Sequence, residues 1–388
     1  MSTAGPAERH HDDTDAAERE FGGAAEREFG GAAEREFGGA AERGAGGTVA
    51  VVGGGIVGLS VAWRLARRGV DVRVHDPGRD DGAWWVAAGM LAPGGESAFE
   101  HAALAELMRE SAKRWPAFAA ELAGETGHDL GYDEAGTLSV ALTADDAAEA
   151  RRMWAYQGLR PTALRELEPE LSPRVRAGAH APDDRQVDPR RVVTALRAAL
   201  AGRIVTGSVA GLGELEADTV VVAAGCGTAA LTGLPVRPVK GQLLRLRGEP
   251  GVLRHVISGA ADGRHVYLVP RADGEVVVGA TQEERTDRAV TAGGVLDLLR
   301  AALDLVPALA EFELVETLVG HRPATPDNAP LLGAVPGDSG RRVLVAAGHH
   351  RNGVLLAPVT ADLIAELVVT GVPDPLLAAF RPGRFSCT

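Results

Sequence analysis

The 388-residue sequence has little cysteine, no long apolar run and no excess of basic residues. Its two cysteines, Cys226 and Cys387, lie far apart and form neither a CxxC motif nor the spacing of a metal site. No run of about 18 apolar residues occurs, and the first 30 residues lack the apolar centre of a secretion signal. These absences predict a cytoplasmic protein with no metal site and no membrane contact.

Basic residues are outnumbered, with 40 Lys and Arg against 53 Asp and Glu, a net charge of −13. Residues 1–47 hold 11 acidic and 5 basic residues, net −6, which leaves 42 and 35, net −7, for the rest. Proteins that bind nucleic acid carry a basic patch or stripe, so nucleic acid is not expected as a partner. The 45% apolar content predicts a globular protein with a substantial core.

Residues 1–47 contain an internal repeat. The octad AAEREFGG occurs at 16–23, 24–31 and 32–39, and it decays to AAERGAGG at 40–47. Paired glycines every eight residues interrupt any helix that the Ala, Glu and Arg residues start, and one Phe per copy cannot form a core. The segment is therefore predicted to be a flexible tail, either a tolerated duplication or a docking segment for a partner.

After the tail, the sequence predicts one βαβ unit. The stretch TVAVVGGGIVGLSVAWRLARRGVDVRVHD, from 48, contains an apolar strand, a glycine turn, an amphipathic helix ending at Gly69 and a second strand ending at Asp76. Gly53, Gly55 and Gly58 satisfy GxGxxG, the fingerprint of a dinucleotide-binding turn. The helix N-terminus is expected to face a pyrophosphate, and the Asp76 carboxylate is expected to accept hydrogen bonds from ribose hydroxyls.

The remainder alternates between helices and strands. Helices are predicted at 102–123, 143–156 and 189–201, and strands at TLSVALT (137), DTVVVAAG (218) and EVVVGAT (275). DTVVVAAG ends in Gly225, and RVLVAAGHHRNG, from 342, repeats that design with a long helix after Gly353. These separated strands suggest an α/β protein in which one cofactor-binding sheet is assembled from distant segments and interrupted by a second domain.

From about 48 to 382 the chain resembles the D-amino-acid-oxidase-like flavoproteins, and within them the glycine oxidases of thiamine biosynthesis. The resemblance is carried by VVGGGIVG, AAGMLAP (87–93), RQVDPRRVV (185–193), RPVKGQ (237–242), HVYLVPR (265–271), HRPATPDNAP (321–330) and AAGHHRNGVLLAP (346–358). It implies a Rossmann-like FAD-binding domain built from 48–131, 177–234 and 324–388. It also implies a mixed α+β substrate domain, built on an antiparallel sheet, from 132–176 and 235–323.

The resemblance implies noncovalent FAD, because neither Cys226 nor Cys387 is placed like the attachment cysteine of related enzymes. One departure from the family is AWWV before AAGM, where Trp84 and Trp85 replace hydroxyl residues and are expected to serve chiefly as packing. The implied cofactor-binding residues are Gly53, Gly55, Ile56, Val57, Gly58, Asp76, Pro77, Ala88, Gly89, Met90, Val209, Gly225, Gly348, His349, His350, Arg351, Asn352, Gly353, Val354 and Leu355.

An amino-acid substrate needs a partner for its carboxylate, and a guanidinium matches that group with two parallel hydrogen bonds. The family places this clamp at Arg322, although from the sequence alone a structural ion pair is an alternative. In HVYLVPR, strand alternation puts His265 and Tyr267 on one face. Tyr267 is expected to contact the carboxylate, His265 to have a peripheral polar role, Met90 to limit room beside the flavin, and Arg351 to lie near the mouth.

The activity implied is oxidation of glycine by hydride transfer to flavin, with sarcosine and small D-amino acids as further candidate substrates. The imine product would yield glyoxylate and ammonia or pass to a thiazole synthase, with oxygen reduced to hydrogen peroxide. The resemblance also implies a homo-oligomer. Alternatives are a dehydrogenase acting on a D-amino acid, proline or sarcosine, a nicotinamide enzyme, and a flavin-binding adaptor that recruits a partner through its tail.

Overall fold

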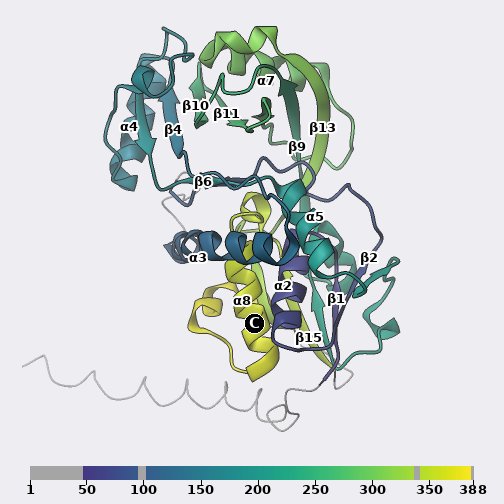
Figure 1. Ribbon diagram of the computed structural model, residues 1–388. Coiled ribbons are helices and arrows are strands. Elements are labelled where there is room, and N and C mark those ends of the chain that lie inside the picture. Colours follow the sequence, from purple (N-terminus) through teal and green to yellow (C-terminus); the bar gives the residue numbers. More distant parts are fainter. Residues whose placement is uncertain (1–46, 95–101, 336–340, 386–388) are drawn as a thin grey trace, which may run out of the picture. The chain divides into compact units, whose positions relative to one another are not determined.

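The computed structural model describes residues 47–94, 102–335 and 341–385. Apart from Gly47, the predicted tail lies outside the described residues, as does Cys387. The described chain forms two large sheets, one of six strands and one of seven, and a two-stranded sheet (Figure 1). The two-stranded sheet pairs β3 (Met90–Leu91) with β6 (Arg185–Gln186).

The six-stranded sheet contains the predicted βαβ unit. β1 (Val49–Val52) pairs in parallel with β2 (Val72–Asp76), and α2 (Ile56–Arg67) connects them. The strand order is β14-β15-β8-β1-β2-β7, where β7 is Ile204–Thr206, β8 is Thr219–Val222, β14 is Leu331–Val335 and β15 is Arg342–Ala347. Every pairing is parallel except that of β14 with β15. The predicted assembly of one sheet from distant segments is therefore confirmed.

Four helices form a packed group beside this sheet: α2, α3 (Ala102–Thr126), α5 (Pro189–Ala199) and α8 (Ala357–Thr370) (Figure 1). The predicted helices at 102–123 and 189–201 match α3 and α5 within three residues. Trp63, Trp115 and Phe118 are fully buried between them, because the apolar stripes of α2 and α3 face one another. The Trp115 Nε1–H donates to the Leu355 carbonyl at 2.9 Å, which satisfies the buried indole.

The seven-stranded sheet has the order β13-β9-β12-β11-β10-β4-β5. Its strands are β4 (Thr137–Ala141), β5 (Ala177–Ala181), β9 (Arg237–Arg247), β10 (Val256–Ala261), β11 (Arg264–Pro270), β12 (Glu275–Gly279) and β13 (Glu313–Ala324). All pairs are antiparallel except β4 with β10. α7 (Ala292–Leu305) packs against this sheet and buries an apolar face of its own. The antiparallel character predicted for the second sheet is thus confirmed.

The helix predicted at 143–156 is α4 (Ala144–Gln157). It begins at a capping box, in which the Thr143 hydroxyl accepts from the Asp146 N–H and the Asp146 carboxylate accepts from the Thr143 N–H. The remaining short elements are α6 (Thr228–Thr232) and the 3-10 helices Leu164–Glu166, Leu212–Glu214, Gly225–Gly227, Pro307–Glu311, His350–Asn352, Pro375–Phe380 and Pro382–Phe385.

The predicted domain boundaries stay a prediction, but one segment crosses them. β5 begins at Ala177, where the prediction starts a stretch of the cofactor domain, yet β5 pairs with β4 in the seven-stranded sheet. In the described part of the chain, no single helix is long and apolar enough to cross a membrane. The bent pair Ala357–Thr370 and Pro375–Phe385 passes that test by length and composition only.

Candidate functional site

The carboxyl ends of the parallel strands meet at a cavity of about 1250 Å³. β1 lies in the middle of the sheet, with β2 on one side and β8 on the other, so the order in which strands are added reverses at β1. Ligands of open α/β sheets bind at such a reversal, outside the carboxyl ends of the strands. The cavity exceeds the roughly 300–1,000 Å³ of ordinary small-molecule pockets. Its size therefore suits a dinucleotide together with a small substrate.

The glycine loop after β1 is shaped by close backbone contacts. Gly53 has φ of +115°, a backbone conformation that residues other than glycine rarely adopt. A Cβ on Gly58 would lie 2.0 Å from the Gly53 carbonyl oxygen, so α2 approaches β1 only because residue 58 is glycine. The N-terminus of α2, beginning after Gly55, offers backbone N–H groups with no partner inside the helix. This loop fits the pyrophosphate of a dinucleotide.

Asp76, at the end of β2, is buried and lines the cavity. Its Oδ2 atom lies 3.7 Å from the Arg197 guanidinium, and a Cβ on Gly54 would lie 2.3 Å from the same oxygen. The carboxylate therefore stands directly against the glycine loop, where it can accept hydrogen bonds from ribose hydroxyls. The need for glycine at position 54, which leaves room for the Asp76 carboxylate, was not predicted from the sequence, because GxGxxG allows any residue there.

The segment after β15 forms another part of the cavity wall. Gly348 has φ of +73° and His350 has φ of +50°, so the chain turns sharply there. Burial lowers the pKa of His349 to about 4, and burial together with the nearby Arg322 lowers that of His350 to about 4, so both rings are neutral at pH 7. His349 Nε2 lies 3.1 Å from the Thr360 hydroxyl.

Two buried polar atoms of this segment, His350 Nε2 and Asn352 Oδ1, have no hydrogen-bond partner among the described residues. Buried polar groups without partners are uncommon in proteins. Of the two residues, His350 lines the cavity, so its Nε2 atom fits a site that is completed by a polar ligand. Together with the glycine loop, this donor and acceptor set suits FAD.

The segment Ala88–Met90 forms a further part of the cavity wall. Ala88, Gly89 and Met90 all line the cavity, and the Ala88 carbonyl accepts a hydrogen bond from Arg271. Arg271 is almost fully buried, also donates to Gln186 Oε1 at 2.9 Å, and has a pKa lowered to about 10 by burial. Its role in holding this segment was not predicted, although Arg271 ends the motif HVYLVPR.

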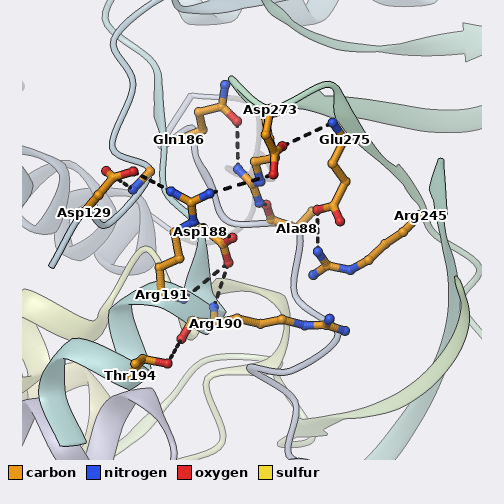
Figure 2. Close-up of polar contacts among 12 residues, drawn as sticks. Ala88, Asp129, Gln186, Asp188, Arg190, Arg191, Thr194, Arg245, Asp273 and Glu275 are labelled. Carbon is orange, nitrogen blue, oxygen red and sulfur yellow. Dashed lines mark hydrogen bonds and ion pairs between the residues drawn. The ribbon is translucent and has the colours of Figure 1, made fainter. Parts of the chain in front are cut away.

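Figure 2 shows the polar contacts around Ala88 and Gln186. Arg191, on α5, forms ion pairs with Asp129 and, at 3.9 Å, with Asp273 in the turn between β11 and β12. Arg190 donates to Glu316 on β13 at 3.1 Å. The pairs with Asp273 and Glu316 tie the start of α5, which belongs to the helices beside the six-stranded sheet, to the seven-stranded sheet.

The seven-stranded sheet supplies the opposite wall through side chains. On β11, Val266 and Leu268 pack in the core with α7, whereas Tyr267 and Val269 belong to a separate apolar cluster that includes Met90. The alternation predicted for HVYLVPR is therefore confirmed. Tyr267 and His265 both line the cavity, Tyr267 half-buried and His265 exposed.

Arg322 lies on β13, two residues before the strand ends at Ala324. Its half-buried side chain lines the cavity, and its Nη1 donates to the Thr281 carbonyl oxygen at 3.2 Å. Within 47–94, 102–335 and 341–385, it has no carboxylate partner within 4.0 Å. Since guanidinium has five N–H donors, most remain available for an anion.

The structure brings most of the predicted site residues to this one cavity. Of those named above, Gly58, Asn352 and Leu355 do not line it, and Gly58 acts instead through helix packing. Trp84 lines the cavity and is 7% exposed, while Trp85 stays outside the lining and stacks against the Arg190 guanidinium, 3.7 Å from its ring centre. The expectation that these two residues act in packing agrees with that arrangement.

Comparison with known proteins gives matches over most of the chain. The profile of the family described as FAD dependent oxidoreductase matches residues 48–367. A glycine oxidase from Geobacillus kaustophilus is 36% identical over 347 residues, which is 81% of this chain and 90% of that protein. The crystal structure of glycine oxidase from Geobacillus kaustophilus superposes with a TM-score of 0.77 at 31% identity, covering 88% of this chain and 99% of that one.

A bifunctional protein ThiO/ThiG from Synechocystis sp. is 36% identical over 356 residues, which is 86% of this chain and 53% of that protein. The chain thus spans about half the length of the bifunctional relatives. The family match, the relatives and the cavity agree on a flavin-binding fold. The chain belongs to the family of FAD-dependent oxidoreductases.

Proposed function

We propose that this protein is a glycine oxidase that binds FAD without a covalent bond and oxidises the Cα–N bond of glycine. The observation that carries the proposal is the Arg322 guanidinium, which lines the cavity with a backbone carbonyl, not a carboxylate, as its partner. The relatives named glycine oxidase, at 31–36% identity, support the choice of substrate.

In this proposal, Arg322 binds the glycine carboxylate through two parallel hydrogen bonds, and Tyr267 adds a third from the same wall. These contacts hold the Cα–H bond at a fixed place, and positioning of this kind supplies much of the rate. Bound FAD supplies the two-electron acceptor for the hydride. Glycine reacts with its amine already deprotonated, and solvent takes that proton, so no side-chain base is required.

The products follow from a two-electron balance. Loss of a hydride and an amine proton converts glycine to its imine, which water hydrolyses to glyoxylate and ammonia. Oxygen takes up two electrons and two protons and forms hydrogen peroxide. The fusion of ThiO with ThiG in relatives supports a second fate, in which a thiazole synthase receives the imine for thiamine biosynthesis.

Noncovalent FAD is supported by the environment of Cys226. This thiol does not line the cavity, and burial raises its pKa to about 11, so it stays protonated and unreactive at pH 7. A thiol of this kind is a poor candidate for attachment to the flavin.

The proposal is tested with the purified full-length protein in air. We expect glycine to give hydrogen peroxide and glyoxylate in equal amounts, and heat denaturation to release the yellow cofactor into solution. Sarcosine, D-alanine and D-proline are assayed beside glycine, because one methyl group changes binding by only about 1–3 kcal/mol. A protein that holds FAD but forms neither product from glycine would refute the proposal.

A further inference from the structure

The seven-stranded sheet contains a lysine with no exposed side-chain surface. Lys240, on β9, donates from Nζ to Asp287 Oδ1 and to the Ala289 carbonyl, each at 2.8 Å, and Glu283 Oε2 lies 3.7 Å away. The hydrogen bonds from Lys240 and the Ala289 N–H hold the pKa of Asp287 well below its usual range. A buried ammonium is costly unless it is paired, so this contact set must be kept intact.

Gln242, two residues further along β9, holds the same segment. Its side chain donates to Glu283 Oε1 at 2.7 Å and to the Thr291 hydroxyl at 2.9 Å, and accepts from the Thr291 N–H at 2.8 Å. Its backbone N–H donates to the Thr281 hydroxyl at 2.9 Å. Lys240 and Gln242 therefore fix both ends of residues 281–291, which we call the tethered segment.

The tethered segment contacts the predicted carboxylate clamp, Arg322, at one point and its neighbour His321 at another. Thr281 provides the carbonyl that accepts from Arg322 Nη1, and the Asp287 carbonyl lies 3.1 Å from His321 Nε2. Because a backbone oxygen of the tethered segment makes the contact to Arg322, the position of the guanidinium depends on the position of that segment.

Gly241, between Lys240 and Gln242, provides the space for the guanidinium. A Cβ at this position would lie 2.4 Å from Arg322 Nη1 and 2.8 Å from Nη2. β9 and β13 pair so that Gly241 stands opposite Gly320, with Arg322 two residues further along β13. Three successive residues thus act on the Arg322 side chain. Gly241 leaves room for the guanidinium, and Lys240 and Gln242 hold the segment that carries the Thr281 carbonyl.

We propose that Lys240 and Gln242 are positioning residues for Arg322, which direct its guanidinium into the cavity by holding the Thr281 carbonyl in place. The inference rests on the proposed function, in which Arg322 binds the substrate carboxylate. Neither side chain lines the cavity, so both act only through the tethered segment.

The test uses the FAD-loaded full-length protein and the variant Lys240→Met, which keeps an unbranched side chain, one heavy atom shorter, and removes its charge. Glycolate, a carboxylate without an amine, is titrated and followed by the change in the flavin spectrum, so binding is measured without turnover. We expect the Kd for glycolate and the KM for glycine to rise at least tenfold, while kcat falls less than threefold and the FAD content stays unchanged.

Arg285→Met is the matched control. Arg285 Nε lies 2.7 Å from Asp287 Oδ2, but its side chain is 57% exposed, so its loss should leave glycolate binding within twofold of wild type. In an Arg322→Ala background, Lys240→Met should change the Kd for glycolate less than twofold further, because the residue through which it acts is gone.

Gln242→Met is the second variant, used in the same assay if Lys240→Met does not give a folded, FAD-loaded protein. Wild-type affinity for glycolate in either folded variant would overturn the inference. Loss of FAD from both variants would also overturn it, since the network would then hold the fold and not the guanidinium. If the wild-type protein itself neither binds glycolate nor oxidises glycine, the proposed function fails instead.

Discussion

The two walls of the cavity use opposite means of binding. Where the parallel sheet ends, the wall is backbone: Gly53, Gly225 and Gly348 follow strands β1, β8 and β15 and line the cavity. The antiparallel sheet instead presents side chains, with Arg322 and Tyr267 facing the same space. In the proposed function, the cofactor wall depends mainly on glycine backbone, with Asp76 as a side-chain contact, whereas the substrate wall depends on particular side chains. Substitutions should therefore fail in different ways on the two walls.

The largest effect is expected on the substrate wall, from Arg322→Ala. Removing one partner of a hydrogen-bonded charge pair costs about 2–5 kcal/mol, which corresponds to roughly 30- to 4,000-fold. We expect the KM for glycine to rise at least 100-fold while the protein still binds FAD in full. Steady-state kinetics measure the KM, and the absorption spectrum measures the FAD content. If Arg322→Ala loses FAD as well as activity, the two walls do not differ in the way proposed.

Behind the cofactor wall, Gly58→Ala should give the reverse pattern. Its Cβ would lie 2.0 Å from the Gly53 carbonyl oxygen, and overpacking costs about 1–3 kcal/mol, or roughly five- to 150-fold. FAD should therefore be lost, while any protein that keeps it should show a normal KM for glycine. Gly213→Ala is the control, because nothing lies within 4 Å of a Cβ there. Full FAD content in Gly58→Ala would show that the helix and strand do not need this glycine.

Acid should weaken the cofactor wall through His349. Its folded pKa is about 4, below the ordinary value of 6.5, so between these pH values only the unfolded chain takes up the proton. Stability is thus fully present above pH 6.5 and is lost as the pH falls towards 4. From pH 7 to pH 5, the free energy of unfolding should fall by about 2 kcal/mol more in wild type than in His349→Gln. Equal falls in urea denaturation would contradict the burial of a neutral ring.

Tyr267→Phe should have the smallest effect. A neutral hydrogen bond contributes about 0.5–1.5 kcal/mol, so the KM for glycine should rise by roughly two- to tenfold without loss of FAD. The packing of the ring near Met90 is kept in Phe, which makes this a test of the hydroxyl alone. An unchanged KM would leave Arg322 as the sole tested contact to the carboxylate.

The two walls also differ in how far they follow from the sequence. Local patterns predicted β1, α2 and β2, and with them the glycine loop and Asp76, because a βαβ unit is formed by about 30 neighbouring residues. Strand alternation likewise predicted that His265 and Tyr267 share a face. Such features need no knowledge of distant pairings.

Features of the substrate wall that depend on long-range contacts were not predictable in the same way. The Thr281 carbonyl that holds Arg322 lies 41 residues away in sequence, and Lys240 meets Asp287 across 47 residues. A lysine in a polar motif gives no local sign of full burial. The same reason explains β5, whose partner β4 is identified by strand pairing and not by its own residues.

The central claim is that Arg322 holds glycine against bound flavin, and the most direct test is anaerobic mixing of the FAD-loaded protein with glycine. The account predicts that the yellow absorbance of wild type bleaches, with a half-saturating glycine concentration that rises at least 100-fold in Arg322→Ala. Wild-type protein that stays yellow, or an Arg322→Ala variant that bleaches at the same glycine concentration as wild type, would contradict it.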